Sequence, residues 1–237
     1  RIAVIPTGID VRKYTRKRKS SIRKAYKIKK EAPLLLYAGR IAEEKNLKFL
    51  IRSIDEIRKK APEAVFVLAG KEERTYKHEL DKLITSRGLE NNIIFTGNLP
   101  ERKLIELYHE AKLFIFPSRS ETQGIVILEA MASGTPVIAV EGPSVDDFID
   151  DGKNGFIMPE DAKMFADKTI DVLDDEETIK RLSRNAKKKA SRFSSEAMVG
   201  KIIDEFKQLK PSGGHYKRLR NIKEIINMDW ESIIRKA

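Results

Sequence analysis

The sequence contains no cysteine. Disulfides, thiolate metal sites and cysteine nucleophiles are therefore excluded. Long hydrophobic runs are lacking as well: none approaches the ~20 apolar residues that a transmembrane helix needs, and there is no signal-like N-terminus. We therefore expect a cytoplasmic protein without a spanning helix, with peripheral attachment to the inner membrane face as an alternative.

Glutamine is scarce, occurring only at Gln123 and Gln208, whereas charged residues make up 35% of the chain. This balance is typical of thermophile proteins, although a biased genome produces the same composition. Hydrophobic residues reach 41%, which is enough for an ordinary buried core. An intrinsically disordered chain is therefore not expected.

The formal net charge of +11 is unevenly distributed: from Arg12 to Lys30 the chain carries eleven Lys and Arg residues and no acid. Such a run suits nucleic acid, anionic lipid or simply a solvated loop. Nucleic acid would favour interleaved aromatic residues, and the run contains only Tyr14 and Tyr26. No recognised DNA or RNA motif is present either, so we do not expect a nucleic-acid partner.

Short apolar runs alternate with longer helical patterns along most of the chain. The runs are continuous and not alternating, which is typical of strands buried on both faces of a parallel sheet. The expected strands are 2–6, 34–39, 65–70, 93–97, 113–117, 136–140 and 155–159. The expected helices between them include 47–60, 76–87 and 102–111. Repeated strand–helix–strand units predict an α/β fold with a Rossmann-like, doubly wound parallel sheet, whose ligands bind outside the carboxyl ends of the strands.

Beyond Pro159 the strands stop, and three helices are expected at about 160–174, 176–192 and 194–209. A Pro-Ser-Gly-Gly break at 211–214 then precedes a final amphipathic helix. One face of that helix carries Ile222, Ile225, Ile226, Trp230, Ile233 and Ile234. We therefore divide the chain into a Rossmann-like domain, 1–209, and a linker with a C-terminal amphipathic helix, 210–237.

The loop after the second expected strand reads GRIAEEKN. Gly39 permits a tight turn at the strand end, and Arg40 and Lys45 place two cations at the carboxyl edge of the sheet. A forked donor and a point charge together suit a diphosphate. Two ordinary surface residues at a helix start are the alternative.

The segment from Pro117 to Ala139 carries a stronger signal. Gly124 opens a helix there, so the free backbone N–H groups of Gly124, Ile125 and Val126 can face an anion. Glu121 precedes the helix and Glu129 follows eight residues later, a spacing that in a helix rises ~12 Å, about the span from a sugar to a ribose across a diphosphate. A helix-start acid and an exposed helix residue are the alternative. Against this alternative, Glu129 lies within an apolar run, where a carboxylate is seldom idle.

These residues resemble the E-x7-E signature of the retaining, two-domain (GT-B) glycosyltransferases of family 4, also called glycosyl transferases group 1. The likeness extends to about Leu209. VIPTGID (4–10) is similar to the family's entry strand and turn, AGRIAEEKN (38–46) to its phosphate loop, FTG (95–97) to its base-side loop and DGKNGFIMP (151–159) to its last strand. The order of these five motifs also matches.

The resemblance implies a role for each matching residue. Arg40 and Lys45 correspond to the diphosphate clamp, and the backbone of 124–126 corresponds to a second phosphate contact. Glu129 corresponds to the carboxylate that holds the ribose, and Glu121 to the catalytic-site carboxylate at the donor sugar. The nucleobase would lie against Gly97, Asn98, Leu99 and Pro100. No Asp-x-Asp occurs, in keeping with an enzyme that needs no metal or other cofactor.

The implied function is transfer of a hexose from a UDP-glucose-like donor, with retention of configuration. ETQG (121–124) is similar to diacylglycerol glucosyltransferases of glycolipid synthesis, which favours a lipid acceptor and an anionic membrane surface as a partner. Asp146-Asp147 stands where many members have a Glu. The family's first, acceptor-binding domain is absent from this chain, so we expect it as a partner and expect the chain alone to be inactive. The alternative is a nucleotide-diphosphate-sugar binding module without transferase chemistry.

Overall fold

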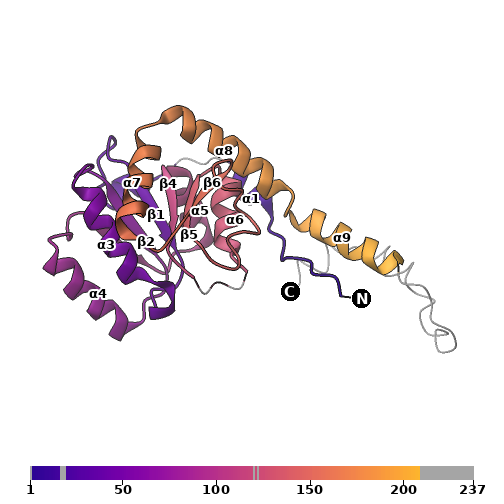
Figure 1. Cartoon of the computed structure of the whole chain (residues 1–237), viewed down its shortest axis with the longest axis horizontal. Helices are drawn as coiled ribbons and strands as arrows, with labels where there is room; N and C mark the ends of the chain where they lie inside the picture. The colour runs from indigo at the N-terminus through magenta and orange to yellow at the C-terminus, as the bar shows by residue number, and fades with distance from the viewer. Residues whose placement is uncertain (1, 17–19, 120, 122, 209–237) are drawn as a thin grey trace.

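In a computed structural model of the chain, residues 2–16, 20–119, 121 and 123–208 are described. At the centre lies a six-stranded parallel sheet (Figure 1) with the strand order β3-β2-β1-β4-β5-β6. The strands are β1 (Leu34–Ala38), β2 (Val65–Ala69), β3 (Ile93–Gly97), β4 (Leu113–Phe116), β5 (Val137–Val140) and β6 (Gly155–Met158). This is the order of the doubly wound dinucleotide-binding fold.

Helices cover both faces of the sheet. They are α1 (Val11–Thr15), α2 (Ile22–Ala25), α3 (Leu47–Arg58), α4 (Arg74–Ser86), α5 (Glu101–Glu110), α6 (Ile125–Ser133), α7 (Ala162–Leu173), α8 (Glu176–Ser191) and α9 (Ser195–Gln208), with a 3-10 turn, η1 (Glu43–Lys45). One core cluster packs α3, α4 and α7 against the sheet, and the other packs α1, α2, α5 and α6. Helix α8 contributes Leu182 to the first cluster and Ala186 and Ala190 to the second.

The sequence pattern explains these layers. All five residues of β1 are buried, as expected for a central strand covered on both faces. Helix α3 buries Leu47, Leu50, Ile51, Ile54 and Ile57, whose spacing of three and four forms one apolar face. Helix α6 is apolar nearly all round because it packs against α8, α1 and α5 as well as the sheet.

The predicted secondary structure is confirmed for six of the seven strands and for each helix expected between 47 and 209. The prediction of a strand at 2–6 is wrong. Residues 2–6 form no helix or strand. The pairing that follows them in the chain is an isolated bridge between Ile9 and Ser194. Ile2 and Val4 are 92% and 89% exposed. A buried strand needs a sheet edge to pair with and apolar surface to pack on, and residues 2–6 belong to none of the six strands of the sheet.

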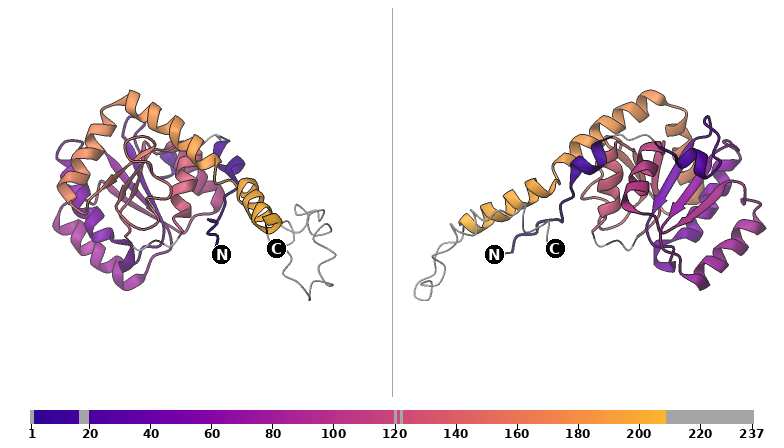
Figure 2. Two further views of the ribbon diagram at one scale, coloured as in Figure 1. Left: turned by 45° about the vertical axis from the view of Figure 1, so that its right-hand side comes forward. Right: turned by 180° about the vertical axis from the view of Figure 1, so that it is seen from behind.

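Helix α9 extends away from the body, and the N-terminal stretch leaves the body beside the start of that helix (Figure 2). The predicted linker and amphipathic helix, 210–237, lie outside the described residues. Within the described part of the chain, no helix has the length and apolar character needed to cross a membrane.

Candidate functional site

The direction of the chain across the sheet reverses between β1 and β4. Strands β2 and β3 follow on one side of β1, whereas β4, β5 and β6 follow on the other. In open parallel sheets the crevice that binds ligands lies outside the carboxyl ends of the strands at this switch point. The two loops that leave it are 39–46, after β1, and 117–124, after β4. These are the two loops in which the sequence predicts a phosphate and sugar site.

The structure joins these loops through an ion pair between two predicted site residues. Lys45 Nζ donates to Glu121 Oε2 at 2.9 Å, and their side chains are only 12% and 23% exposed. Asn46 adds a second link by donating to the carbonyl of Pro117 at 3.3 Å. A half-buried Lys–Glu pair is screened less by solvent than a surface pair, so it holds the two loops in register.

Arg40 lies at the same edge but is turned to the surface. Its side chain is 65% exposed, and Nη2 donates to Glu44 Oε1 at 2.5 Å, one turn further along. The backbone of this loop is pinned because the Tyr37 hydroxyl donates to the Arg40 carbonyl at 2.8 Å. A Cβ at Gly39 would stand 2.7 Å from that hydroxyl, so the turn requires glycine. Lys45, and not Arg40, is therefore the cation that faces Glu121.

Helix α6 begins where the sequence predicts it. Gly124 is its N-cap residue with φ of 58°, a left-handed conformation that suits glycine. The first N–H groups of a helix have no acceptor within the helix, so those of Gly124, Ile125 and Val126 form an electropositive end after Glu121. The Glu121 carbonyl accepts a hydrogen bond from the Ser144 hydroxyl, which fixes the loop in front of this helix end.

The expected ~12 Å between Glu121 and Glu129 assumes that the whole span between them is helical, and the start of α6 at Ile125 shows that this assumption is wrong. Helix α6 begins at Ile125, so the helical part of this span, 125–129, accounts for a rise of about 6 Å. Glu121, Gln123 and Gly124 lie before the helix, so helical geometry does not set their positions.

Glu129 lies in a different environment from Glu121. Its Oε1 accepts from the Tyr14 hydroxyl at 2.7 Å, and its Oε2 accepts from the Tyr108 hydroxyl at 2.9 Å. Burial raises the pKa of Glu129, and the two tyrosine hydrogen bonds oppose that rise. The pKa of each tyrosine is raised too, by burial and by the nearby carboxylate. Both carboxylate oxygens of Glu129 are therefore hydrogen-bonded within the fold, and its assignment to the ribose stays a prediction.

Neither tyrosine was predicted as a site residue. Tyr14 lies in the basic run on α1, and Tyr108 lies on α5. The sequence signal for Tyr14 is slight: an aromatic residue in an otherwise charged stretch, one turn after a helix-capping Asp10. Tyr108 follows Leu107 in an ordinary amphipathic pattern, and nothing in that pattern distinguishes a polar contact from packing.

The predicted base-side residues form the turn from β3 into α5. Gly97 ends β3 with φ of 64°, and its carbonyl accepts from the Gly70 N–H at 3.0 Å. Asn98 is exposed, Leu99 packs on the core and Pro100 is the N-cap residue of α5. This turn shares the carboxyl edge of the sheet with the other two loops, two strands away from β1.

The described part of the basic run contains two short helices, α1 and α2, followed by an irregular stretch at 26–30. Helix α1 packs on α6, and α2 packs on α5. Three of its cations pair with acids elsewhere in the fold: Arg12 with Glu196, Lys13 with Glu101 and Arg23 with Glu110. Arg16, Lys24, Lys27, Lys29 and Lys30 are exposed, and Lys17, Arg18 and Lys19 lie outside the described residues.

Other candidate features border the two site loops: Glu72 forms a bridge with Ile41, and Ser144 precedes Asp146 by two residues. Asp146 and Asp147 are exposed in the loop between β5 and β6. No group of three or more His, Asp or Glu side chains that could hold a metal ion occurs in the ranges that the structure describes. A surface pocket on and before α4 is lined by Glu72, Arg74, Thr75, Lys77, His78 and Asp81, none of which is a predicted site residue.

Comparison with known protein families and sequences shows clear similarity. Residues 18–189 match the model of the family described as glycosyl transferases group 1. The sulfoquinovosyl transferase SQD2 of Arabidopsis thaliana is 35% identical over 179 residues, which are 74% of this chain and 33% of that protein. An alpha-monoglucosyldiacylglycerol synthase of Streptococcus pneumoniae is 33% identical over 153 residues, 62% of this chain and 34% of that protein. The chain thus spans about one third of the length of these two relatives.

Solved structures share the fold. Anabaena Alr3699/HepE in complex with UDP and glucose superposes with a TM-score of 0.79 at 25% identity, covering 87% of this chain and 57% of that one. The same protein has been solved with UDP-glucose, with a TM-score of 0.78. The C-terminal domain of a Francisella tularensis group 1 family protein, LpcC, has a TM-score of 0.69 at 24% identity, covering 78% of this chain and 97% of that domain.

Proposed function

Because the chain belongs to the glycosyl transferases group 1 family, we propose that it is the half of a two-domain glycosyltransferase that binds the nucleotide-diphosphate sugar. Its Rossmann-like α/β fold, a six-stranded parallel sheet with helices on both faces, matches the GT-B glycosyltransferases among its structural neighbours. The observation that carries the proposal is the half-buried Lys45–Glu121 pair, located at the switch point of the sheet and in front of the N-terminus of α6.

This arrangement has the chemistry that a nucleotide-sugar donor requires. A lysine ammonium and the free N–H groups at a helix start both stabilise negative charge, so a diphosphate fits between Lys45 and residues 124–126. Glu121 then lies beside the sugar end of the donor, and Glu129 lies further along α6 towards the ribose. Arg40 reaches the diphosphate by leaving its surface pair with Glu44, and the turn from Gly97 to Pro100 holds the base.

For the donor we propose UDP-glucose or a similar UDP-hexose, transferred with retention of configuration. The support is the structural neighbour at 25% identity, which was solved with UDP and with UDP-glucose. The departing diphosphate gains charge as the glycosidic bond breaks, and Lys45 with the start of α6 would stabilise that charge. In this role they replace a divalent cation, so transfer should continue in the presence of EDTA.

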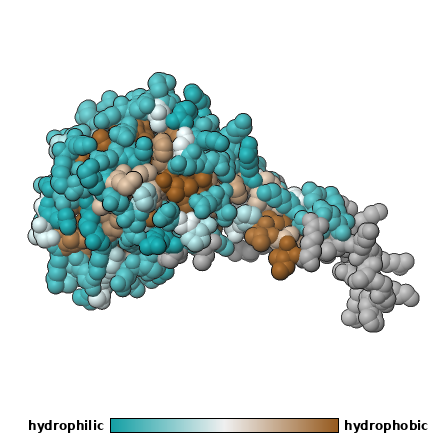
Figure 3. Space-filling view, viewed as in Figure 1, coloured by the Kyte–Doolittle hydropathy of each residue, from teal (hydrophilic) through white to brown (hydrophobic). Residues whose placement is uncertain are grey.

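The acceptor would be bound by a second half that is not part of these 237 residues. A face of α9 fits contact with such a half: Val199, Ile202 and Phe206 are 41%, 41% and 60% exposed. Their spacing of three and four places them on one side of the helix, and Figure 3 shows hydrophobic residues gathered where α9 and the N-terminal stretch leave the body. Alone, the chain should bind donor without transferring sugar, because acceptor positioning and exclusion of water are missing.

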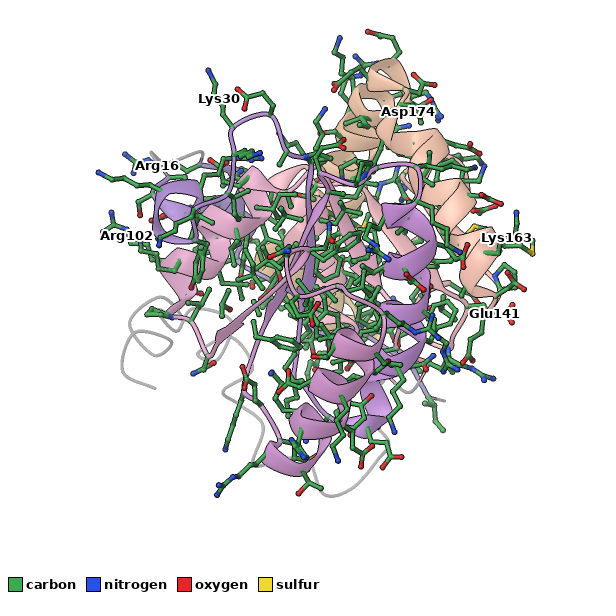
Figure 4. The ribbon with its side chains drawn as sticks, turned by 90° about the vertical axis from the view of Figure 1, so that its left-hand side faces the viewer. Arg16, Lys30, Arg102, Glu141, Lys163 and Asp174 are labelled. Carbon is green, nitrogen blue, oxygen red and sulfur yellow. The ribbon has the colours of Figure 1, made fainter. Side chains whose placement is uncertain are left out.

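For the acceptor we propose a lipid, and for the partner surface an anionic membrane. The support is the match to a monoglucosyldiacylglycerol synthase together with the cationic face built by α1, α2 and α5. Figure 4 shows Arg16, Lys30 and Arg102 pointing outward on the same side of the molecule. Each exposed cation near an anionic bilayer contributes about 1 kcal/mol and is screened by salt.

Two experiments test the proposed function. Calorimetric titration with UDP, GDP and ADP, each also as its glucose or mannose conjugate, should show binding that depends on the diphosphate. If the chain binds none of these nucleotides and none of their sugar conjugates, the proposed function is refuted. Co-sedimentation with phosphatidylglycerol vesicles should decrease with salt and with the triple variant Lys24→Ala/Lys27→Ala/Lys30→Ala. The charge-matched control is Lys59→Ala/Lys168→Ala/Lys180→Ala, whose lysines lie directly after α3, on α7 and on α8. Equal sedimentation with neutral vesicles would contradict the proposal that an anionic membrane is the partner surface.

Transfer assays with the gene's full-length product distinguish a transferase from a binding module. A transferase should move hexose to an acceptor such as diacylglycerol, with the donor's anomeric configuration retained. A product that binds UDP-glucose but transfers nothing to lipid, sugar or peptide acceptors would favour the module without transferase chemistry.

A further inference from the structure

The Glu129 carboxylate is held by two tyrosine hydroxyls that come from distant parts of the chain. Tyr14 lies on α1 and Tyr108 on α5, 115 and 21 residues away from Glu129 in sequence. Their rings meet edge to face, with centroids 6.2 Å apart and an interplanar angle of 71°. The contacts place one hydroxyl on each carboxylate oxygen, at 2.7 and 2.9 Å.

Both tyrosines are themselves fixed. Tyr108 is fully buried, its ring packs against Phe114 with centroids 5.7 Å apart, and its carbonyl accepts from the Thr135 hydroxyl at 2.5 Å. Tyr14 is 7% exposed, and its helix α1 packs on α6. Because each donor is rigid and each carboxylate oxygen has one of them, the carboxyl group can neither turn about its terminal torsion nor withdraw without losing a hydrogen bond.

The two hydrogen bonds leave acceptor capacity unused. An ionised carboxylate has about four lone-pair sites, and the tyrosines occupy two of them. One free site on each oxygen suits two neighbouring hydroxyl groups, which is the arrangement of a ribose 2′,3′-diol. Glu129 is also half-buried, so hydrogen bonds to it gain strength from a reduced local dielectric.

We infer that Tyr14 and Tyr108 are positioning residues that hold Glu129 in the orientation that accepts both hydroxyls of the donor ribose. This inference rests on the proposed function, since it assigns to the nucleotide site two residues that do not themselves contact the nucleotide. It makes the site selective for ribose over deoxyribose. It also makes the short basic segment around α1 part of the nucleotide site.

The same hydrogen bonds favour the ionised form of Glu129 and oppose the effect of burial. Burial raises the pKa of its carboxyl group, and the two tyrosine donors lower it. The other charged groups that face it are Lys13 from α1 and Glu101 from α5, which pair with each other at 3.0 Å. Removing one tyrosine hydroxyl should therefore raise the pKa of Glu129 further and move the acid limit of nucleotide binding to higher pH.

The test uses Tyr14→Phe and Tyr108→Phe, which keep the rings and delete only the hydroxyl groups. Tyr26→Phe is the matched control, because Tyr26 packs against the same core cluster and Glu129 accepts no hydrogen bond from it. Calorimetry with UDP and with 2′-deoxy-UDP should show that each site variant binds UDP about tenfold more weakly. The preference for UDP over 2′-deoxy-UDP should shrink in the same variants and stay unchanged in the control.

A second measurement needs no nucleotide. Carbon-13 NMR titration of the Glu129 carboxyl group should give a higher pKa in both site variants than in the wild type or in Tyr26→Phe. Unaltered selectivity for the ribose hydroxyl together with an unaltered pKa would overturn the inference. If the wild type binds no nucleoside diphosphate, the proposed function fails, and the NMR titration still decides whether the tyrosines control Glu129.

Discussion

Glu121 and Glu129 are eight residues apart, yet the fold surrounds them with opposite chemistry. Glu121 faces a lysine, so its charge is neutralised by a full opposite charge in a partly open loop. Glu129 faces two neutral hydroxyls beside a buried helix, so its charge is solvated by dipoles and not cancelled. A carboxylate paired with lysine is available only when that lysine is drawn away, whereas one held by hydroxyls is ready to accept hydrogen bonds at once.

The difference indicates a division of labour along the donor. Under the proposed function, a diphosphate that takes Lys45 would free Glu121 beside the sugar, where positive charge develops on the ring during transfer. The proposed ribose contact at Glu129 would be made equally before and during the reaction, so it would support binding uniformly.

Removing the lysine should have the largest effect. Lys45→Ala should weaken UDP binding by about 3 kcal/mol, the upper range for a hydrogen bond to a charged group, and should leave uridine binding unchanged. Arg40→Ala should cost about 1.5 kcal/mol, because Arg40 is exposed and already paired with Glu44. Calorimetry measures both, and Lys48→Ala, which removes a surface lysine of α3, is the control. Equal losses for uridine and UDP would show that Lys45 does not bind phosphate.

Neutralising the two carboxylates should affect UDP affinity differently. Glu129→Gln should weaken UDP and UDP-glucose alike, by about 1–3 kcal/mol, through lost hydrogen bonds to a charged acceptor. Glu121→Gln should leave UDP affinity intact or slightly improved, because Lys45 is released for the diphosphate. It should weaken UDP-glucose only modestly and lower the turnover of the full-length protein by about 10²-fold. A loss of UDP affinity in Glu121→Gln as large as in Glu129→Gln would reverse the assignment.

A backbone change at the start of α6 should have an intermediate effect. Gly124→Ala forces an L-residue into a left-handed conformation, which costs about 1–2 kcal/mol, and its Cβ would stand 3.0 Å from the Phe148 ring. Chemical denaturation should show this loss. Gly200→Ala is the control: it lies within helix α9 with no atom near its Cβ, so it should stabilise by about 0.5–1 kcal/mol. An unchanged stability in Gly124→Ala would mean that the helix start differs from the one described.

The pH dependence of stability should show the smallest effect. The folded-state pKa of Glu129 lies above its ordinary value of 4.5, so the folded protein holds this proton more tightly than the unfolded chain. The contribution of Glu129 is therefore fully present below pH 4.5 and is lost as pH rises through the folded pKa. Each unit by which the folded-state pKa exceeds the unfolded-state pKa corresponds to about 1.4 kcal/mol of stability. Between pH 4.5 and the folded-state pKa, the free energy of unfolding should fall less steeply with pH for Glu129→Gln than for the wild type. The same slope in both proteins would contradict a raised pKa of Glu129.

Much of the architecture could be predicted from residue pattern. Continuous apolar runs of five or six residues mark β1 and β2, because a strand covered on both faces has no polar side. The failed strand at 2–6 has the same kind of run. The apolar residues of this run do not show whether a sheet edge is available for pairing. The six strands of the sheet are supplied by later segments of the chain.

The position of the site could also be predicted, since it follows from local rules. A glycine that opens a helix after a strand leaves free N–H groups at the edge where parallel strands end. The sequence predicts Arg40, Lys45, Glu121 and residues 124–126 as candidates; the structure places the first three and Gly124 in the loops that leave β1 and β4, and residues 125–126 in the first turn of α6. Their separate roles stay predictions until the titrations above are made.

The strands, the amphipathic helices and the charged loops follow from local sequence pattern, because they depend on neighbours a few residues apart. The contact of Glu121 with Lys45 instead of Arg40, and the sharing of Glu129 by Tyr14 and Tyr108, arise from the packing of the whole fold. Those contacts join residues 76, 115 and 21 positions apart, and no short-range pattern records them. They exist because the β1–β4 neighbourhood and the packing of α1, α5 and α6 bring distant segments to within hydrogen-bond distance.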